Sequence, residues 1–207
     1  MPENLHKLFV ISSPSGGGKT SLINKVFEDS RSANFEKSIS DTSRQKRQGD
    51  LEGKDYYFLS EKDFKDKIKK EEYVEYATVF GNFYGTSKEE IKTKYNNSNL
   101  ILELDWQGAY AVKELFDDAK LIFLVPPSLD DLKQRLIKRN LDSSEAIENR
   151  LSEAKKEISK SEMYDYLVLN DDFDKAFEDL SQILFEGISP IDFNSRASKD
   201  LIKRLVE

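Results

Sequence analysis

A glycine-rich segment near the start of the chain has the composition of a phosphate-binding loop. Residues 8–13 form a short apolar run typical of a buried strand, and the next residues are Pro14-Ser15-Gly16-Gly17-Gly18-Lys19-Thr20. Three consecutive glycines allow the backbone to turn several N–H groups toward one anion. Lys19 adds a mobile positive charge for the outer phosphates of a nucleotide, and the Thr20 hydroxyl can reach Mg²⁺. The segment therefore predicts a site for a nucleoside triphosphate with Mg²⁺ as cofactor.

The loop departs from the usual pattern at one position. Phosphate-binding loops begin with Gly five residues before the final Gly-Lys pair, and this chain has Ser13 there. The preceding strand and the helix predicted at about 19–28 support the prediction, because that helix would direct its positive dipole end at the same anion. The residues of this segment predicted to bind ATP are Ser13, Pro14, Ser15, Gly16, Gly17, Gly18, Lys19 and Thr20, and Thr20 is the predicted metal ligand.

Length and composition indicate a soluble enzyme with one sizeable core. The chain has 207 residues, a formal net charge of −7 and no cysteine, which excludes disulfides and thiol chemistry. It has no apolar run of transmembrane length, and its start lacks the pattern of a secretory signal, so we expect a cytoplasmic protein without a membrane partner. The acidic balance argues against nucleic-acid binding. The sequence leaves the oligomeric state open, a homo-oligomer included.

Arginine is rare in this chain and is grouped. Among 32 basic residues only eight are Arg, and five of these fall into two groups. The first group is Arg44 and Arg47, and the second is Arg135, Arg139 and Arg150. The planar guanidinium binds phosphate through two parallel hydrogen bonds, which the ammonium of Lys cannot do. The grouping therefore favours two phosphate-binding clusters over isolated surface ion pairs.

Short apolar runs alternate with amphipathic segments along the chain. Strands are predicted at 8–13, 100–105, 121–125 and 166–170, each suited to a sheet that is covered on both faces. Helices are predicted near 19–28, 87–96, 107–117, 128–139, 143–162 and 172–185, with a further amphipathic segment at 197–206. This alternation predicts an α/β fold with a mostly parallel sheet flanked by helices.

Two regions interrupt the alternation. From about 38 to 88 the chain is rich in Tyr, Phe and charged residues, with half-exposed strands predicted at 56–59, 73–80 and 83–84 and a helix at 61–70. We interpret this region as a small antiparallel insertion that stands over the main sheet. The polar stretch 138–150 is typical of a mobile flap between two helices.

Motifs along nearly the whole chain resemble those of the guanylate kinases. They occur in order at 13–20, 40–50 (Ser-Asp-Thr-Ser-Arg-Gln-Lys-Arg-Gln-Gly-Asp), 53–58, 81–86 (Gly-Asn-Phe-Tyr-Gly-Thr), 104–108 (Leu-Asp-Trp-Gln-Gly), 125–128 and 170–172. The Ser-x-x-x-Arg-x-x-Arg and Gly-Asn-aromatic-Tyr-Gly patterns are specific to that family, unlike the phosphate loop. The resemblance implies ATP-dependent phosphorylation of GMP to GDP with Mg²⁺, with dGMP as a further acceptor, in purine nucleotide recycling.

The resemblance also implies three parts within a single unit of residues 1–207. A P-loop NTPase-type core would comprise 1–37, 89–126 and 153–207. A GMP-binding insertion would span 38–88, and a helical lid would span 127–152. The lid would close over the substrates to exclude water, since water would otherwise accept the phosphoryl group.

The predicted GMP site requires cations and hydroxyl groups for the phosphate of the acceptor. Arg44 and Arg47 lie three residues apart and can converge on that phosphate from one loop. Ser40 and the hydroxyl groups of Tyr56 and Tyr84 can donate to the same oxygens. These five residues are therefore predicted to bind GMP through its phosphate.

Guanine recognition is assigned to carboxylates at the matching family positions. Guanine presents N1–H and N2–H₂ donors side by side, and Glu75 and Asp105 are the positions that would accept from them, with the Thr86 hydroxyl near the base. Adenine has an unprotonated N1 there, so a buried carboxylate would face a lone pair. Unpaired buried groups of this kind discriminate between ligands by roughly 10⁴–10⁵.

Phosphoryl transfer itself requires little acid–base chemistry, because the attacking oxygen of GMP is already anionic. The protein must instead align the two substrates and neutralise the charge on the phosphoryl group in transit. The residues predicted to be catalytic are Lys19, Arg44, Arg139 and Arg150. Arg135 is predicted to stack on adenine or meet the ATP phosphates, and Asn170 is predicted to contact the ribose or base of ATP.

Three positions depart from the family pattern. Asp50 occupies a position that usually has Glu, and Glu103, two residues before Asp105, occupies one that usually has Asp. Each keeps its charge while its reach changes by about 1.5 Å. We therefore predict supporting roles for both, in orienting Arg residues, water or the metal. Asn140 replaces the usual Gly after Arg139, and Asn tolerates the unusual backbone angles of such a turn better than most residues.

Two alternatives stand beside the main interpretation. The first is a P-loop kinase for another small phosphorylated acceptor, which would leave the set of Arg44, Arg47, Glu75 and Tyr84 without a purpose. The second is a non-catalytic, guanylate-kinase-like binding module. Such modules lack the lysine of the phosphate loop, whereas this chain has Lys19 and paired lid arginines.

Overall fold

A computed structural model describes residues 6–79, 81–138, 144–191 and 195–207. Its centre is a five-stranded sheet in the order β2-β7-β1-β8-β9, in which every neighbouring pair is parallel. These strands are β1 (Leu8–Ser12), β2 (Phe35–Lys37), β7 (Asn99–Glu103), β8 (Lys120–Val125) and β9 (Tyr166–Leu169). The predicted parallel sheet is confirmed, but β2 was not predicted, since three residues at a sheet edge leave almost no periodic pattern.

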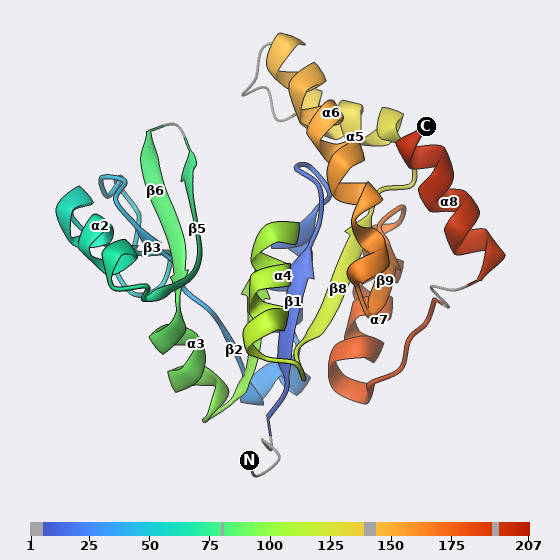
Figure 1. Cartoon of the computed structure of the whole chain (residues 1–207). Coiled ribbons are helices and arrows are strands. Elements are labelled where there is room, and N and C mark those ends of the chain that lie inside the picture. The colour runs from blue at the N-terminus through green and yellow to red at the C-terminus, as the bar shows by residue number, and fades with distance from the viewer. Residues whose placement is uncertain (1–5, 80, 139–143, 192–194) are drawn as a thin grey trace.

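Helices cover both faces of this sheet (Figure 1). On one face lie α1 (Lys19–Glu28), α7 (Phe173–Ser181) and the π-helical turn η3 (Gln182–Glu186). On the other lie α3 (Lys88–Tyr95), α4 (Trp106–Leu115), α6 (Ser144–Ser159) and α8 (Arg196–Val206). The remaining helical segments are α5 (Leu129–Lys138) and the short turns η1 (Ser30–Asn34) and η2 (Ser161–Met163). Within the described ranges, no helix combines the length and apolarity that a membrane crossing requires.

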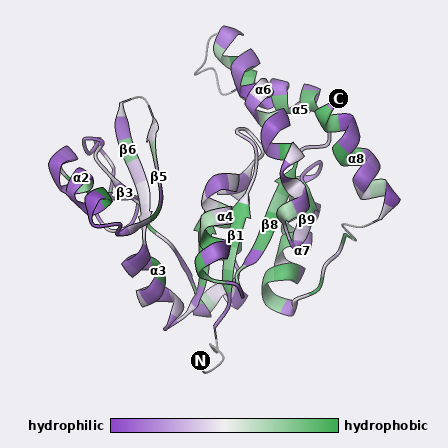
Figure 2. Cartoon of the chain, viewed as in Figure 1, coloured by the Kyte–Doolittle hydropathy of each residue, from purple (hydrophilic) through white to green (hydrophobic). Residues whose placement is uncertain are grey.

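The two apolar clusters follow from the alternation of side chains along each strand. In β1, Leu8 and Val10 belong to the cluster under α3 and α4, whereas Phe9 and Ile11 belong to the cluster under α1 and α7. Successive side chains of a strand point to opposite faces, so a continuous apolar strand needs helices on both sides. Figure 2 shows this distribution, with hydrophobic strands at the centre and hydrophilic residues on the outer helices.

A second sheet stands beside the first and contains four strands in the order β4-β3-β6-β5. Its elements are β3 (Asp41–Thr42), β4 (Tyr57–Phe58), β5 (Tyr73–Val79), β6 (Asn82–Ser87) and the helix α2 (Glu61–Lys69). The β3–β6 and β5–β6 pairs are antiparallel, as the sequence predicts, whereas β3 and β4 pair in parallel. The parallel pair was not expected, because two-residue strands carry no pattern that sets their direction.

The second sheet has an aromatic core of its own. The buried ring of Phe64, from α2, stacks on Tyr73 at 4.5 Å and on Phe83 at 5.3 Å between ring centroids. Beneath these rings, the buried carboxylate of Asp41 accepts hydrogen bonds from the Tyr73 hydroxyl at 2.8 Å and from Lys67 Nζ at 2.5 Å. These contacts hold α2 and β5 against β3, the strand that leads into the segment of Arg44.

We predict that Phe64→Ala lowers the free energy of unfolding by about 3–5 kcal/mol, because it removes a fully buried ring from a small core. Urea unfolding followed by circular dichroism measures this loss. Tyr76→Ala is the matched control, since Tyr76 lies in the same sheet and is 53% exposed. Equal losses for the two variants would contradict the aromatic core.

Candidate functional site

The loop between β1 and α1 leaves the start of α1 open to an anion. Gly16 and Gly18 have backbone φ angles of 89° and 90°, which lie in the left-handed region that residues other than Gly rarely adopt. Gly18 immediately precedes α1, and no side chain caps this helix. By contrast, Ser87 caps α3 and Asp105 caps α4. The first N–H groups of α1 are therefore available to a bound phosphate.

Asn170 supports this loop from behind. It directly follows β9 and is 4% exposed, and its Nδ2 donates a hydrogen bond to the carbonyl of Gly17 at 2.6 Å. A Cβ at Gly18 would lie 2.4 Å from the same nitrogen, so only Gly fits there. In this structure the amide of Asn170 contacts the loop and not the open cavity. The contact with the ribose or base of ATP therefore stays a prediction.

One arginine of the second group contacts this loop directly, and another contacts Asn170, which supports the loop. Arg135, on α5, donates from its guanidinium to the carbonyl of Asn170 at 2.7 Å. Arg150, on α6, donates to Ser15 Oγ at 2.7 Å. Arg150 therefore contacts the loop itself and Arg135 is connected to it through Asn170, while the binding of phosphate by either guanidinium stays a prediction. Arg139 and Asn140 lie outside the described residues.

Lys19 is partly buried at the start of α1, and its Nζ donates to the carbonyl of Leu104 at 3.0 Å. Burial lowers the pKa of its ammonium group, and the nearby carboxylates of Glu103, Glu157 and Asp105 act in the opposite direction. The ammonium therefore has carboxylates around it and a carbonyl as its hydrogen-bond partner. A bound polyphosphate would give it a stronger partner than that carbonyl.

Glu103 connects the phosphate loop with the edge of the main sheet. Thr20 Oγ1 donates to one carboxylate oxygen at 2.5 Å, and Lys37 Nζ donates to the other at 2.6 Å. Burial alone would raise the pKa of this carboxyl, but the hydrogen bonds from Lys37 and Thr20 outweigh it and hold the pKa below its usual range. Glu103 is therefore an ionised group fixed beside the predicted metal ligand Thr20.

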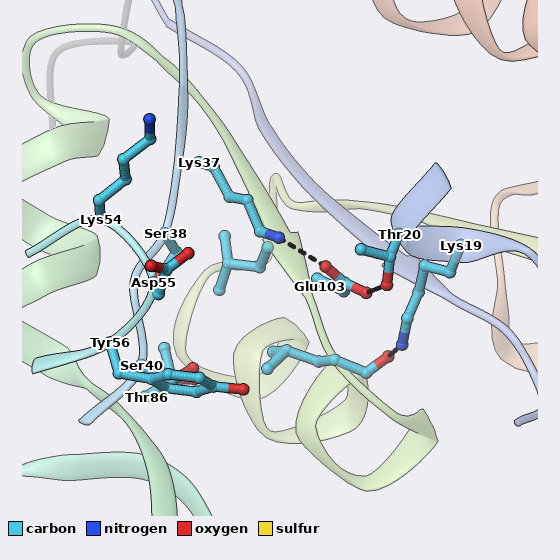
Figure 3. A pocket seen from close by; sticks show the side chains of 12 residues that line it. Lys19, Thr20, Lys37, Ser38, Ser40, Lys54, Asp55, Tyr56, Thr86 and Glu103 are labelled. Carbon is cyan, nitrogen blue, oxygen red and sulfur yellow. Dashed lines mark hydrogen bonds and ion pairs between the residues drawn. The ribbon is translucent and has the colours of Figure 1, made fainter. Parts of the chain in front are cut away.

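A cavity of about 380 Å³ joins the phosphate loop to the second sheet. Figure 3 shows Lys19, Thr20 and Glu103 on one side of it, and Ser40, Tyr56 and Thr86 on the other. Lys37, Ser38, Lys54 and Asp55 complete its polar wall. Residues predicted for a phosphoryl donor and residues predicted for its acceptor therefore face one shared space.

Arg44 lies in an aromatic and acidic environment within the second sheet. Its guanidinium forms an ion pair with Asp50 at 2.9 Å and lies 5.4 Å from the ring centre of Tyr56. Tyr56 in turn makes an edge contact with Tyr84, with 5.7 Å between ring centroids. The structure thus gathers four predicted site residues, and the ion pair with Asp50 orients the Arg44 guanidinium. The supporting role of Asp50 in substrate binding stays a prediction.

Arg47 differs from Arg44 in its surroundings. It is exposed, and its backbone N–H donates to Asp50 at 2.8 Å. That N–H and the guanidinium of Arg44 hold the pKa of the Asp50 carboxyl below its usual range. The convergence of both guanidinium groups on one phosphate stays a prediction, as does the contact of Ser40 with that phosphate.

The residues predicted to bind guanine lie together. Glu75 pairs with Thr86 across β5 and β6, and the Thr86 hydroxyl donates to Glu75 Oε1 at 2.7 Å. Burial raises the pKa of the Glu75 carboxyl. The negative charge of nearby Asp105 raises this pKa further, whereas the hydrogen bond from Thr86 lowers it. Asp105 itself accepts from the N–H of Gly108 at 2.8 Å as the cap of α4. A ligand with adjacent donors would satisfy both carboxylates.

Two functional candidates were missed from the sequence. Lys37 is one of many lysines and lies outside the motif that starts at residue 40, and Glu157 lies on a helix where a charged residue is typical of a solvated face. In the structure, Glu157 Oε2 is buried and has no hydrogen-bond partner among the described atoms. Burial is the main reason why the pKa of its carboxyl is raised to about 7. The positive charge of Lys19 lowers this pKa, and the negative charge of Asp105 raises it.

Comparisons with known proteins agree with this geometry. A family model described as "Guanylate kinase" matches residues 5–187. The guanylate kinase of Wolbachia sp. subsp. Brugia malayi (strain TRS) is 45% identical over 88% of this chain and 93% of its own length. That of Hahella chejuensis (strain KCTC 2396) is 47% identical over 86% and 85% of the two chains. The crystal structure of guanylate kinase from Anaplasma phagocytophilum has a TM-score of 0.68 and 31% identity, and covers 99% of this chain and 98% of its own.

We predict that Glu157 makes the stability of the fold depend on pH. Its carboxyl binds a proton more readily when folded, so stability falls as pH rises from the ordinary value of 4.5 toward about 7. Glu157→Gln removes this dependence, and the variant should exceed the wild type in unfolding free energy at pH 8 but much less at pH 5. Urea unfolding at the two pH values measures this. Glu145→Gln, an exposed change on the same helix, is the control, and identical pH profiles for all three proteins would refute the prediction.

Proposed function

The chain belongs to the guanylate kinase family and is therefore a nucleoside monophosphate kinase, and we propose that its cavity is the place where the terminal phosphoryl group of Mg·ATP passes to GMP. One observation carries this assignment. The phosphate loop and the Glu75–Thr86 pair belong to different sheets, yet Lys19, Thr20 and Thr86 line the same cavity. A phosphoryl donor and a guanine-bearing acceptor bound to these residues would meet within it.

On the donor side, the backbone N–H groups before α1 and the ammonium of Lys19 bind the phosphates of ATP. Lys19 exchanges the carbonyl of Leu104 for a phosphate oxygen, which is a stronger, charge-assisted partner. Asn170 and Arg135 keep the loop in the conformation that presents those N–H groups. Arg150, which donates a hydrogen bond to Ser15 of the loop in this structure, neutralises phosphate charge.

The residues beside the loop fit Mg²⁺. The described residues contain no cluster of three or more His, Cys, Asp and Glu side chains that could hold a metal ion. Mg²⁺ that enters with a nucleotide requires no such cluster, since phosphates and water supply most of its ligands. Thr20 would hold it through its hydroxyl oxygen, and Glu103 would accept from Thr20 or from metal-bound water. The ion supplies positive charge on the phosphates and orients them.

On the acceptor side, the second sheet binds GMP. The guanidinium of Arg44, oriented by Asp50, and the hydroxyl groups of Tyr56, Tyr84 and Ser40 bind the phosphate, with Arg47 joining from the exposed side. Glu75 and Asp105 accept from the guanine donors, with Thr86 holding Glu75 in place. None of these residues is assigned to the sugar, so dGMP is proposed as a second acceptor.

Transfer proceeds by alignment and charge neutralisation. The anionic oxygen of the GMP phosphate attacks the terminal phosphorus of ATP, and the bond from that phosphorus to the leaving oxygen of ADP breaks, so no protein base is required. Lys19 and Arg150 supply positive charge around the phosphoryl group in transit, and we include Arg139 with them. We propose that residues 127–152 act as a lid over the core and the 38–88 insertion, in a cytoplasmic enzyme of purine nucleotide recycling.

In the first test, the protein receives Mg·ATP together with GMP, dGMP, AMP, CMP or UMP, and the release of ADP is measured. We expect rapid turnover with GMP and dGMP and little with the others. Turnover confined to another monophosphate would contradict the acceptor assignment while keeping the kinase. ATP binding without turnover on any acceptor would favour a binding module instead.

We predict that Glu75→Gln lowers kcat/KM for GMP by about 10- to 100-fold, the value of one or two hydrogen bonds to a charged group, and leaves that for AMP unchanged or higher. The amide would place its own N–H₂ against the guanine donors. Steady-state kinetics with both nucleotides measure the ratio. Glu89→Gln, an exposed change at the start of α3, serves as the control. An unaltered GMP-to-AMP ratio in Glu75→Gln would exclude Glu75 from base recognition.

A further inference from the structure

The carboxylate of Glu103 accepts hydrogen bonds from two side chains that approach it from opposite sides. Thr20 donates to Oε1 at 2.5 Å and Lys37 Nζ donates to Oε2 at 2.6 Å. Figure 3 shows Lys37 and Thr20 pointing at the two oxygens of this carboxylate across the cavity wall. The carboxylate therefore has its orientation fixed at both oxygens.

Lys37 reaches this position because of the order of the main sheet. It is the last residue of β2 and Glu103 is the last residue of β7, and the two strands are neighbours in parallel register. Their carboxyl ends therefore meet at the edge where α1 begins. Both side chains are partly buried, with 36% of Lys37 and 19% of Glu103 exposed, which makes their ion pair stronger than a fully exposed one.

This arrangement has a consequence for Thr20. A hydroxyl group that donates its proton to a carboxylate keeps its oxygen lone pairs for another partner. Glu103 therefore turns the Thr20 oxygen into an acceptor for a cation, and Lys37 keeps Glu103 from rotating toward that cation itself. Groups that orient a metal ligand in this way commonly change metal affinity by about 10- to 100-fold when altered.

We propose that Lys37 is a positioning residue of the phosphoryl-transfer site, which holds Glu103 on Thr20 and so sets how strongly the nucleotide site depends on Mg²⁺. This inference rests on the proposed Mg·ATP site. Without Lys37, the carboxylate of Glu103 loses its ion-pair partner and is free to turn onto the metal ion or its bound water, and the Lys19 ammonium is then the nearby positive charge that remains. Nucleotide binding then depends more strongly on Mg²⁺ than in the wild type.

The test measures equilibrium binding of a non-hydrolysable ATP analogue to the full chain, once with Mg²⁺ and once with EDTA. The ratio of the two dissociation constants is the Mg²⁺ enhancement. We expect Lys37→Met to increase this ratio about fivefold or more, because a carboxylate that has lost its ion-pair partner would lie beside a divalent cation. Lys37→Arg keeps the ion pair and should stay within twofold of the wild type.

Two further variants separate positioning from charge alone. Lys54→Met removes a lysine from the wall of the same cavity and should leave the ratio within twofold of the wild type. In a Glu103→Gln background, Lys37→Met should change the ratio by less than twofold, since no carboxylate remains to be released. A fivefold effect that persists in that background would overturn the positioning role.

Two further results would separate a failure of this inference from a failure of the proposed Mg·ATP site. An unchanged ratio in Lys37→Met, in a protein that unfolds at the wild-type temperature and whose wild type shows Mg²⁺ enhancement, would overturn this inference alone. A wild type whose nucleotide binding is indifferent to Mg²⁺ would overturn the proposed Mg·ATP site together with it.

Discussion

The site depends on one constraint: a loop that must present unpaired N–H groups to an anion has to be held in place by contacts to its other atoms. The hydrogen bond from Asn170 to the carbonyl of Gly17 meets this constraint. Because Asn170 follows β9, it connects the loop after β1 with a strand at the far edge of the sheet. Arg135 then fixes the backbone of Asn170 itself, so the loop is braced by elements far along the chain.

The electrostatics of the site oppose the overall charge of the protein. A chain of net charge −7 can hold polyanions at the proposed site, because its positive groups there are local and act at short range. Lys19 has the carboxylates of Glu103, Asp105 and Glu157 nearby, which balance its partly buried charge before a nucleotide arrives. Incoming phosphates would take over that role, and the carboxylates would be left to hydroxyl groups, water and the metal ion.

The sequence predicted the architecture well where patterns were long. Continuous apolar strands such as 8–13 and 121–125 required helices on both faces, and the parallel sheet, the second sheet and the family are confirmed. Short elements escaped prediction, β2 and the parallel β3–β4 pair among them, because two or three residues show neither periodicity nor direction. Pairing of such segments is decided by what lies next to them in space.

The sequence by itself determined the phosphate loop, since glycines followed by Lys19 and Thr20 have local geometry that few other functions require. It also predicted which residue types would surround the proposed acceptor. Only the tertiary structure decided which side chains share a partner: Lys37 with Glu103, Asn170 with Gly17, and Glu157 near Lys19. The physical reason is that hydrogen bonds and charge interactions act over a few ångströms of space, whereas these residues are separated by long stretches of chain.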